Sequence, residues 1–564
     1  TVAVTGTLKH SAPSVENTIN VNGGTMAISG TMDVYNVVNN VNGDKFQVTN
    51  NGKLDVVNFT NNGIVNVTNP TYIFVANAVT GENMYRYFNM TNVALNASST
   101  LKGANIKFAG TNTLDRANLT DSKVTVNSGA KLQVISDSYY LNEINVASLQ
   151  NNGIVEVAAY EKLTVTGDVN SNELTVNGTL TAASLTNNGT LTVGNYANVN
   201  VTNTVSNKAT AIVNGTLTAA TLNNNNNNKT LTVNGTLTAT TELYNAANAT
   251  INGSGNIKAD ASTITDLTNN GVIEGDLTIS AKTIYNYNKI DVAEIVATDF
   301  YNTNITYSSV TVDDATLQSV TFTNSGTVNV SGESTVKITN EVSDSGQFVM
   351  EGVNLTSSNT NLHGAYIVFN GENSAKDLTF SGKDDFLTNV GIEVNGTLNI
   401  YGEVTANHLG TGDGTVVLKE TTSKLTANTD LKLYPEEDPF VISGVDGYHV
   451  VHGTDNIGFH NGVYTLKSND AYVAMVNGNY YETIQGAIYA AEDGNIIEIL
   501  KSTEQNVTVD RNVSFTAGAA VTVTGTLTVE AEKVVSFNNA NVTFNSTRVG
   551  ANVELNINNS TMNQ

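Results

Sequence analysis

The sequence contains no cysteine and no tryptophan, and only 4 of its 564 residues are proline. Without cysteine the chain can form neither a disulfide framework nor a thiolate metal site. Charged residues make up 14% of the chain, against about 25% in an ordinary soluble domain. The 26 basic residues are outnumbered by 51 acidic ones, so the formal net charge of −25 argues against nucleic-acid binding. No run of about 18 apolar residues occurs, so we expect no membrane span.

Asparagine is what the chain has in excess, with about 85 residues or about 15% of the total, and threonine is almost as common. Hydrophobic residues still make up 40% of the chain, which is enough to build a core and argues against acidic disorder. Length alone would suggest about four domains, but that estimate fails if the chain is an array of repeats.

Short repeats run along most of the chain. VNGTLTA occurs at 176–182, 213–219 and 233–239, and VNGTLNI follows at 394–400. Asn-Gly favours a tight turn, for which we expect glycine to supply a positive φ angle. The residues after it alternate between apolar and hydroxyl side chains, as in a strand with one buried face. Turn spacings near about 10 and 20 residues fit a coil of about 20 residues.

Two all-β architectures could produce this pattern, namely a sandwich of hairpins and a parallel β-helix. We favour a right-handed parallel β-helix, because the same short strand recurs with one apolar face and small residues at its corners. Stacked coils would also let asparagine side chains form ladders along the axis, which gives the asparagine excess a physical use. The run at 223–228 is interpreted as a corner loop of low complexity.

The chain divides into three expected parts: a repeat β-helix at residues 1–415, a small β-rich insert or hinge domain at 416–475, and a helix-capped short β-helix at 476–564. The insert loses the repeat and holds Pro435, Pro439 and the acidic cluster Glu436, Glu437 and Asp438. In the last part, residues 483–492 carry apolar side chains at helical spacing, and Gly494 suits a helix C-terminus. A buried strand is expected at 496–500.

The segment 476–500 resembles the opening of pectin-lyase-like parallel β-helices, in which a helix caps the first coil. The 1–415 repeats look like those of large bacterial and archaeal cell-surface proteins, such as adhesins and S-layer-like proteins. The resemblance implies architecture more than function. The residues that match the cap motif in type and spacing are Ile484, Gln485, Ala487, Ile488, Ala490, Ala491, Gly494, Ile497 and Ile499.

The ends of the pattern suggest assembly. Residues 1–8 already alternate like a strand with no leader, so either a signal peptide has been removed or the chain has been trimmed, and we expect a secreted protein. The capping helix lies near residue 480, with only about three coils after it. Because an uncapped coil is an open sheet edge, we expect subunits to pair end to end into a filament or lattice. The competing interpretation is that a downstream anchor domain is absent.

No catalytic residues are assigned from the sequence. Lyases and hydrolases of the related fold need paired or tripled carboxylates on one face. Asp313–Asp314 and Asp384–Asp385 are the only adjacent pairs of aspartates, and neighbours on a strand point to opposite faces. We interpret both pairs as structural or solvated.

No metal or cofactor site is assigned either. His449, His452 and His460 cluster with Asp455 in the insert, but their spacing matches no ligand pattern, so we interpret them as ordinary surface or core residues. The net charge leaves Ca²⁺ as the cation to consider, although Gly412, Asp413 and Gly414 are too short a match to a calcium loop.

Acceptor motifs for N-glycosylation are frequent, but about 17 of the roughly two dozen would arise by chance from this composition. Several fall within repeat turns, where we expect exposure. The candidate acceptors are Asn58, Asn177, Asn214, Asn234, Asn395, Asn506 and Asn541.

The leading functional prediction is a non-enzymatic, extracellular structural or adhesive protein of a cell surface, with itself as partner and host or microbial glycans as further partners. Tyrosines around 285–307 are the binding candidates, against simple coil packing. A carbohydrate-active enzyme is the alternative, and a cleft lined by several acids along one face would favour it. A phage tail spike is a weaker third interpretation.

Overall fold

The computed structural model describes residues 1–9, 16–43, 45–81, 87–136, 141–225, 228–258, 266–382, 391–407, 409–411, 414–428, 432–433, 441–452 and 462–563. The chain forms two compact units. The first comprises Thr1–Val353, Ser358–Val368 and Ser381–Lys383, and the second comprises Asn354–Ser357, Phe369–Phe380 and Asp384–Gln564.

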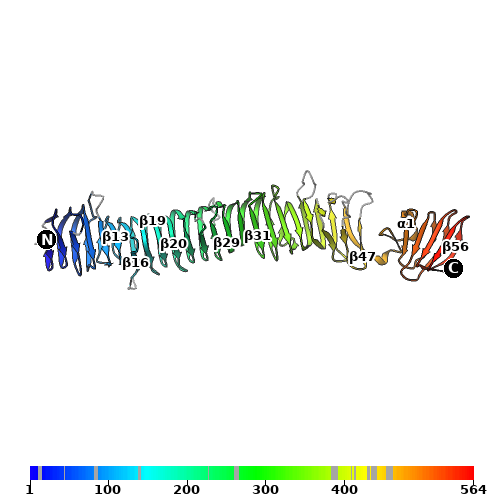
Figure 1. Ribbon diagram of the computed structural model, residues 1–564, viewed down its shortest axis with the longest axis horizontal. Helices are drawn as coiled ribbons and strands as arrows, with labels where there is room; N and C mark the ends of the chain where they lie inside the picture. The colour runs from blue at the N-terminus through cyan, green and yellow to red at the C-terminus, as the bar shows by residue number, and fades with distance from the viewer. Residues whose placement is uncertain are drawn as a thin grey trace. The chain divides into compact units, whose positions relative to one another are not determined.

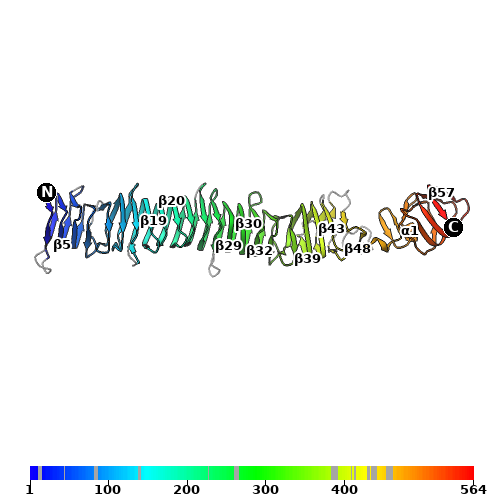
Figure 2. The same ribbon diagram turned by 90° about the horizontal axis from the view of Figure 1, so that it is seen from below.

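The first unit is a parallel β-solenoid, whose coils stack one on the next (Figures 1 and 2). Strands β19 (Lys162–Val176), β20 (Thr179–Val193) and β21 (Asn198–Asn207) show the register, in which Leu163 pairs with Leu180 and Leu180 with Val199. Every pairing described within this unit is parallel, which confirms the β-helix and rules out the hairpin sandwich there.

The coil length agrees with the repeat. Val176, Val193, Val213 and Val233 are successive partners along one ladder, separated by 17, 20 and 20 residues. Strands such as β24 (Thr230–Val233) alternate half-buried threonine with fully buried leucine or valine. Burying one such apolar side chain contributes about 1.5–3 kcal/mol, so the alternation drives the coil closed.

The glycine of the repeated Asn-Gly corners serves close packing and not an unusual φ angle. Gly178, Gly215 and Gly235 do not have positive φ, contrary to our expectation. A Cβ atom on Gly178 would lie 2.2 Å from the carbonyl oxygen of Glu161, and one on Gly235 would lie 2.1 Å from that of Gly215. The coils approach each other too closely at these corners for any side chain.

An asparagine ladder runs inside the first unit, as the asparagine excess predicted. Each side chain is buried and donates its amide to the oxygen of the next asparagine at 2.7–3.0 Å. In six members the amide also donates to a backbone carbonyl, as from Asn187 to Thr210 at 2.8 Å, which helps to satisfy the buried polar groups. The ladder consists of Asn187, Asn207, Asn224, Asn245, Asn269, Asn286, Asn302 and Asn324.

The run at 223–228 is therefore more than a corner loop. Asn223 and Asn224 end strand β23 (Thr216–Asn224), and Asn224 is fully buried in the ladder. Asn228 has a φ of +56° in the turn that follows, while residues 226 and 227 lie outside the described residues. The sequence does not show which asparagines belong to the strand and which to the turn, because the same residue type occupies both.

In the second unit, β41 (Thr397–Asn407) pairs in parallel with both β43 (Thr415–Leu418) and β44 (Lys424–Ala427). Two antiparallel strands follow, β47 (Tyr448–His452) and β48 (Gly462–Ser468), and β48 also pairs with β44. The prolines and acidic cluster expected between 434 and 440 lie outside the described residues.

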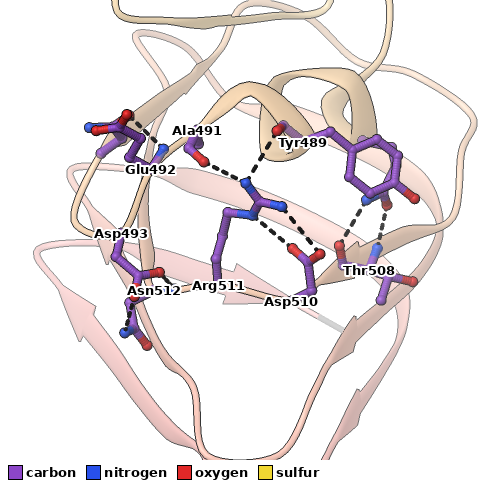
Figure 3. A network of polar contacts seen from close by, with 10 residues as sticks. Tyr489, Ala491, Glu492, Asp493, Thr508, Asp510, Arg511 and Asn512 are labelled. Carbon is purple, nitrogen blue, oxygen red and sulfur yellow. Dashed lines mark hydrogen bonds and ion pairs between the residues drawn. The ribbon is translucent and has the colours of Figure 1, made fainter.

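Helix α1 (Ile484–Ala490) confirms the predicted helix. Thr483 caps its N-terminus by accepting a hydrogen bond from the amide of Gly486 at 2.9 Å, and Ile484, Ala487 and Ile488 are buried. At the other end, Arg511 donates to the carbonyl of Ala491 at 2.6 Å (Figure 3). The guanidinium thus supplies partners and positive charge to the helix C-terminus.

The last coils have their own core, which packs under α1. One sheet contains β51 (Ile496–Ile499), β53 (Val513–Thr516), β55 (Val534–Asn538) and β57 (Glu554–Asn558), and the strands β52 (Val507–Val509), β54 (Val521–Val529), β56 (Asn541–Val549) and β58 (Thr561–Asn563) form the other. Phe515 and Phe537 stack between successive coils with ring centroids 5.3 Å apart.

Candidate functional site

Changes in corner length leave hollows in the surface of the first unit, among them a notch beside 177–178 and a groove beside Ala293. Strand register aligns Val157, Val176 and Val193 before one corner and Lys162, Thr179 and Asn198 after it. The corner therefore has four residues at 158–161, two at 177–178 and four again at 194–197. A short corner between two longer ones leaves a notch.

Two tyrosines flank this notch, one on each longer corner. Tyr160 is 90% exposed and Tyr196 is 95% exposed, and both line the same hollow of about 750 Å³. Because each coil rises about 4.8 Å, two coils separate the corners by about 9.6 Å. Asn177 and Gly178 form the floor between them. We call this hollow the tyrosine notch; its lining residues are Ala159, Tyr160, Asn177, Gly178, Thr179, Gly194, Asn195, Tyr196 and Asn198.

Tyr160 adopts a left-handed backbone conformation, with φ of +69°. Among corners closed by a hydrogen bond from the fourth residue to the first, Asn51, Asp121, Gly129 and Asn248 hold this position with positive φ, whereas Tyr196 holds it without positive φ. Short polar side chains tolerate that conformation, whereas a bulky one is strained there. Tyr160 is the one aromatic residue with positive φ in the described part of the chain.

The residue after Tyr160 is an unusual buried acid. Glu161 is 7% exposed and accepts hydrogen bonds from the backbone amides of Asn142 at 3.0 Å and Ser136 at 3.2 Å. Burial raises the pKa of Glu161 above its ordinary value, against the opposing effect of these two hydrogen bonds. Its carboxylate thus binds the backbone at Ser136 and at Asn142 and does not line the notch.

An acidic groove is the second hollow. Its corner has two residues at 276–277, one at Ala293 and three at 313–315, so the surface dips at Ala293. The groove has a volume of about 770 Å³. Five carboxylate residues line it: Glu274, Asp276, Asp291, Asp313 and Asp314.

One lysine neutralises part of the acidic groove. Glu274 pairs with Asp291 across adjacent coils, and Nζ of Lys289 lies 3.4 Å from Glu274 and 3.0 Å from Asp291. The hydrogen bond to Asp291 raises the pKa of Lys289 above its ordinary value. Carboxylates and a lysine together could serve acid–base chemistry.

The predicted pair Asp313–Asp314 falls within this groove, although each carboxylate has its own partner. Asp313 accepts a hydrogen bond from the hydroxyl of Ser331 at 2.6 Å, and Asp314 accepts one from the amide of Glu333 at 2.8 Å. Sequence reasoning missed Glu274, Asp276 and Asp291 as their neighbours, because strand register brings them together from separate coils. Asp384 and Asp385 lie outside the described residues.

The tyrosines around 285–307, which the sequence suggests as ligand-binding candidates, differ in their surroundings. Tyr285 and Tyr301 stack on successive coils with centroids 5.1 Å apart, which is coil packing on the outer face. Tyr307 is 70% exposed but lines neither hollow. The tyrosine notch was missed because Tyr160 and Tyr196 are 36 residues apart, and only corner alignment relates them.

The histidine cluster is described only in part. Nδ1 of His449 lies 2.8 Å from Oδ1 of Asn469, and its ring stacks on Tyr480 at 4.1 Å. His452 belongs to β47, where its backbone pairs with Tyr464. His460, Asp455, Gly412 and Asp413 lie outside the described residues. Among the described residues, no group of three or more His, Cys, Asp or Glu could hold a metal ion.

The candidate glycosylation acceptors differ in accessibility. Asn58 is half-buried in an outer ladder, donating to Asn36 at 2.9 Å and accepting from Asn77 at 2.7 Å. Asn234 donates its amide to half-buried Asn214 at 2.9 Å. The exposed acceptors are Asn177, Asn234, Asn395, Asn506 and Asn541.

No protein-family model, curated protein or solved structure matches this chain. Among the described helices, none is both long and apolar enough to cross a membrane.

Proposed function

We propose that this protein is an extracellular, non-enzymatic component of a cell surface with a structural and adhesive role. The asparagine ladder from Asn187 to Asn324 is the observation that supports it most. A satisfied polar ladder inside a stack of coils makes a scaffold from repeated, locally stabilised units. Such a scaffold presents corner residues sideways at regular intervals, which suits contact with many partners along one surface.

Self-association is the second part of the proposal. Each parallel coil offers an edge that another coil can pair with in the same register, as β24 does with β22 (Thr210–Val213). Contact between the terminal coils of two copies would be heterologous, and such contacts give filaments or lattices when they do not close. Net charge of −25 opposes lateral association at low salt, which favours contact through coil ends.

Negative-stain electron microscopy of the native protein, with light scattering across a range of concentrations, tests this role. We expect filaments or a lattice whose amount grows with concentration. A particle that stays monomeric at every concentration would contradict self-assembly. Surface labelling of intact source cells with an antibody tests the location, and labelling only after lysis would contradict it.

A carbohydrate-active enzyme is the second candidate, favoured by the acidic groove. Glu274 and Asp291 lie on adjacent coils with Lys289 beside both, as an acid–base arrangement requires. Product release from a panel of acidic and neutral polysaccharides would support this activity if Asp291→Asn abolished it. Release that is equal in Asp291→Asn and the wild type would contradict a role for the groove.

A further inference from the structure

We infer that the tyrosine notch binds one pyranose ring of an external, uncharged glycan, held between the side chains of Tyr160 and Tyr196. This inference rests on the adhesive part of the proposed function and gives it a ligand class. The apolar faces of sugar rings stack on aromatic rings, and tyrosine offers a large contact area at low cost in side-chain entropy. Both rings are almost fully exposed, so water covers faces that a ligand could cover.

The spacing of the two corners leaves room for one ring. Two coil rises place their corners about 9.6 Å apart. A ring stacked on both sides needs two contacts of about 3.5–4 Å each, or about 7–8 Å in total. The short Asn177–Gly178 corner keeps the intervening space open, and Gly178 cannot be replaced by a larger residue without meeting the backbone of Glu161.

The chemistry of the lining points to an uncharged ligand. All nine residues around the notch are uncharged, although the chain as a whole carries a net charge of −25. Asn177, Asn195 and Asn198 supply amide donors and carbonyl acceptors, and Thr179 supplies a hydroxyl. Sugar hydroxyls both donate and accept hydrogen bonds, so they match this mixture better than a carboxylate or an ammonium group would.

The backbone of Tyr160 is the independent observation. Asn51, Asp121 and Asn248 adopt the same left-handed conformation in comparable corners, and their short polar side chains tolerate it better than the bulky side chain of Tyr160 does. A strained residue whose side chain has no role in the core indicates selection for something other than folding. With 90% of Tyr160 exposed, core packing does not account for it.

Affinity electrophoresis of protein made in a host without N-glycosylation tests the inference. The probes are hydroxyethyl cellulose, arabinoxylan, yeast mannan and glycol chitin, four soluble neutral polymers. We expect at least one polymer to retard the wild type. Tyr160→Asn and Tyr196→Ala should each weaken that retardation by about tenfold or more, whereas Tyr196→Phe should keep it. Tyr307→Ala is the matched control for an exposed tyrosine outside the notch, and it should not change retardation.

Folding of the variants is checked separately, because Tyr160→Asn should keep or raise the melting temperature while it loses binding. No retardation of the wild type by any polymer would overturn the inference, as would full retardation of both notch variants. A glycan found on Asn177 in the native protein would also overturn it, because that glycan would fill the notch from within. The assembly seen by microscopy does not depend on these outcomes, so failure here leaves the structural role to its own test.

Discussion

Asn187 donates a hydrogen bond from Nδ2 to Oδ1 of Asn207, 2.7 Å away on the adjacent coil, and both side chains are only 1% exposed. The register explains this contact, since Asn187 within β20 and Asn207 at the end of β21 are direct partners. Each further coil adds one asparagine at the same position. The interior thus holds a row of buried amides, and each finds its hydrogen-bond partner only when the next coil stacks in the correct register. The ladder therefore favours this register over others.

Removing one member of this ladder should destabilise the solenoid locally. Asn245→Ala would leave the amide of Asn224 without its acceptor and the oxygen of Asn269 without its donor, both buried. Each unsatisfied buried group costs about 1–3 kcal/mol, so for two groups we expect a loss of about 2–6 kcal/mol. Hydrogen exchange of the amides in the flanking coils measures it, because solenoid stability is a sum of local terms.

The control for this experiment is Asn234→Ala, which breaks the exposed contact between Asn234 and Asn214. Water can replace that hydrogen bond, so we expect a change below about 1 kcal/mol. Equal effects of Asn234→Ala and Asn245→Ala would show that burial of the ladder contributes nothing.

Tyr160→Asn should raise stability, by about 1 kcal/mol, because asparagine tolerates the left-handed conformation with φ of +69°. The reciprocal change, Asn248→Tyr, places the same bulky residue in an equivalent corner and should cost about the same amount. Thermal unfolding followed by circular dichroism compares the two variants with the wild type. A lower melting temperature for Tyr160→Asn would mean that Tyr160 contributes to the fold.

Gly178→Ala tests the close approach of the coils. Its Cβ would meet the carbonyl oxygens of Glu161 at 2.2 Å and Ala158 at 2.4 Å, so the backbone must shift. Forcing an extra carbon into a packed site costs about 1–3 kcal/mol, and we expect a loss of that size. Gly24→Ala is the control, since nothing lies within 4 Å of a Cβ there. Urea unfolding of both variants gives the difference, and no difference between them would refute the packing argument.

The sequence predicts the solenoid well because each coil is encoded by a short run of neighbouring residues. The repeat at 176–182 gives the alternation, the corner and the coil length, all of which the structure confirms. The expectation that the repeated glycine supplies a positive φ angle is wrong. Gly178 is needed because its backbone lies close to the carbonyl oxygen of Glu161 on another coil, and its φ angle is not positive. The two hollows could not be predicted for the same reason: they depend on which corners lie side by side, and that requires the register of every strand between them.

Glu161 and Glu156 should change the free energy of unfolding in opposite directions as pH rises. Burial raises the pKa of Glu161 in the folded state, so the folded chain holds its proton to higher pH than the unfolded chain does. Stability from this group is therefore greatest below the unfolded value of about 4.3 and falls as pH rises through the raised pKa. Glu156 differs, because hydrogen bonds from Lys131 lower the pKa of its carboxyl, so its stabilisation is lost as pH falls.

The measurement is the free energy of unfolding of the wild type, Glu161→Gln and Glu156→Gln at several values across about pH 3–7. Comparing each variant with the wild type separates the effect of one glutamate from the charge repulsion of a chain with net charge −25. Relative to Glu161→Gln, the wild type should lose stability as pH rises above the ordinary glutamate range. Relative to Glu156→Gln, it should gain stability as pH rises, because the contact with Lys131 at 3.0 Å forms only with the ionised carboxylate. Parallel curves for all three proteins would mean that neither environment distinguishes the folded from the unfolded state, and that Glu161 is solvated in solution.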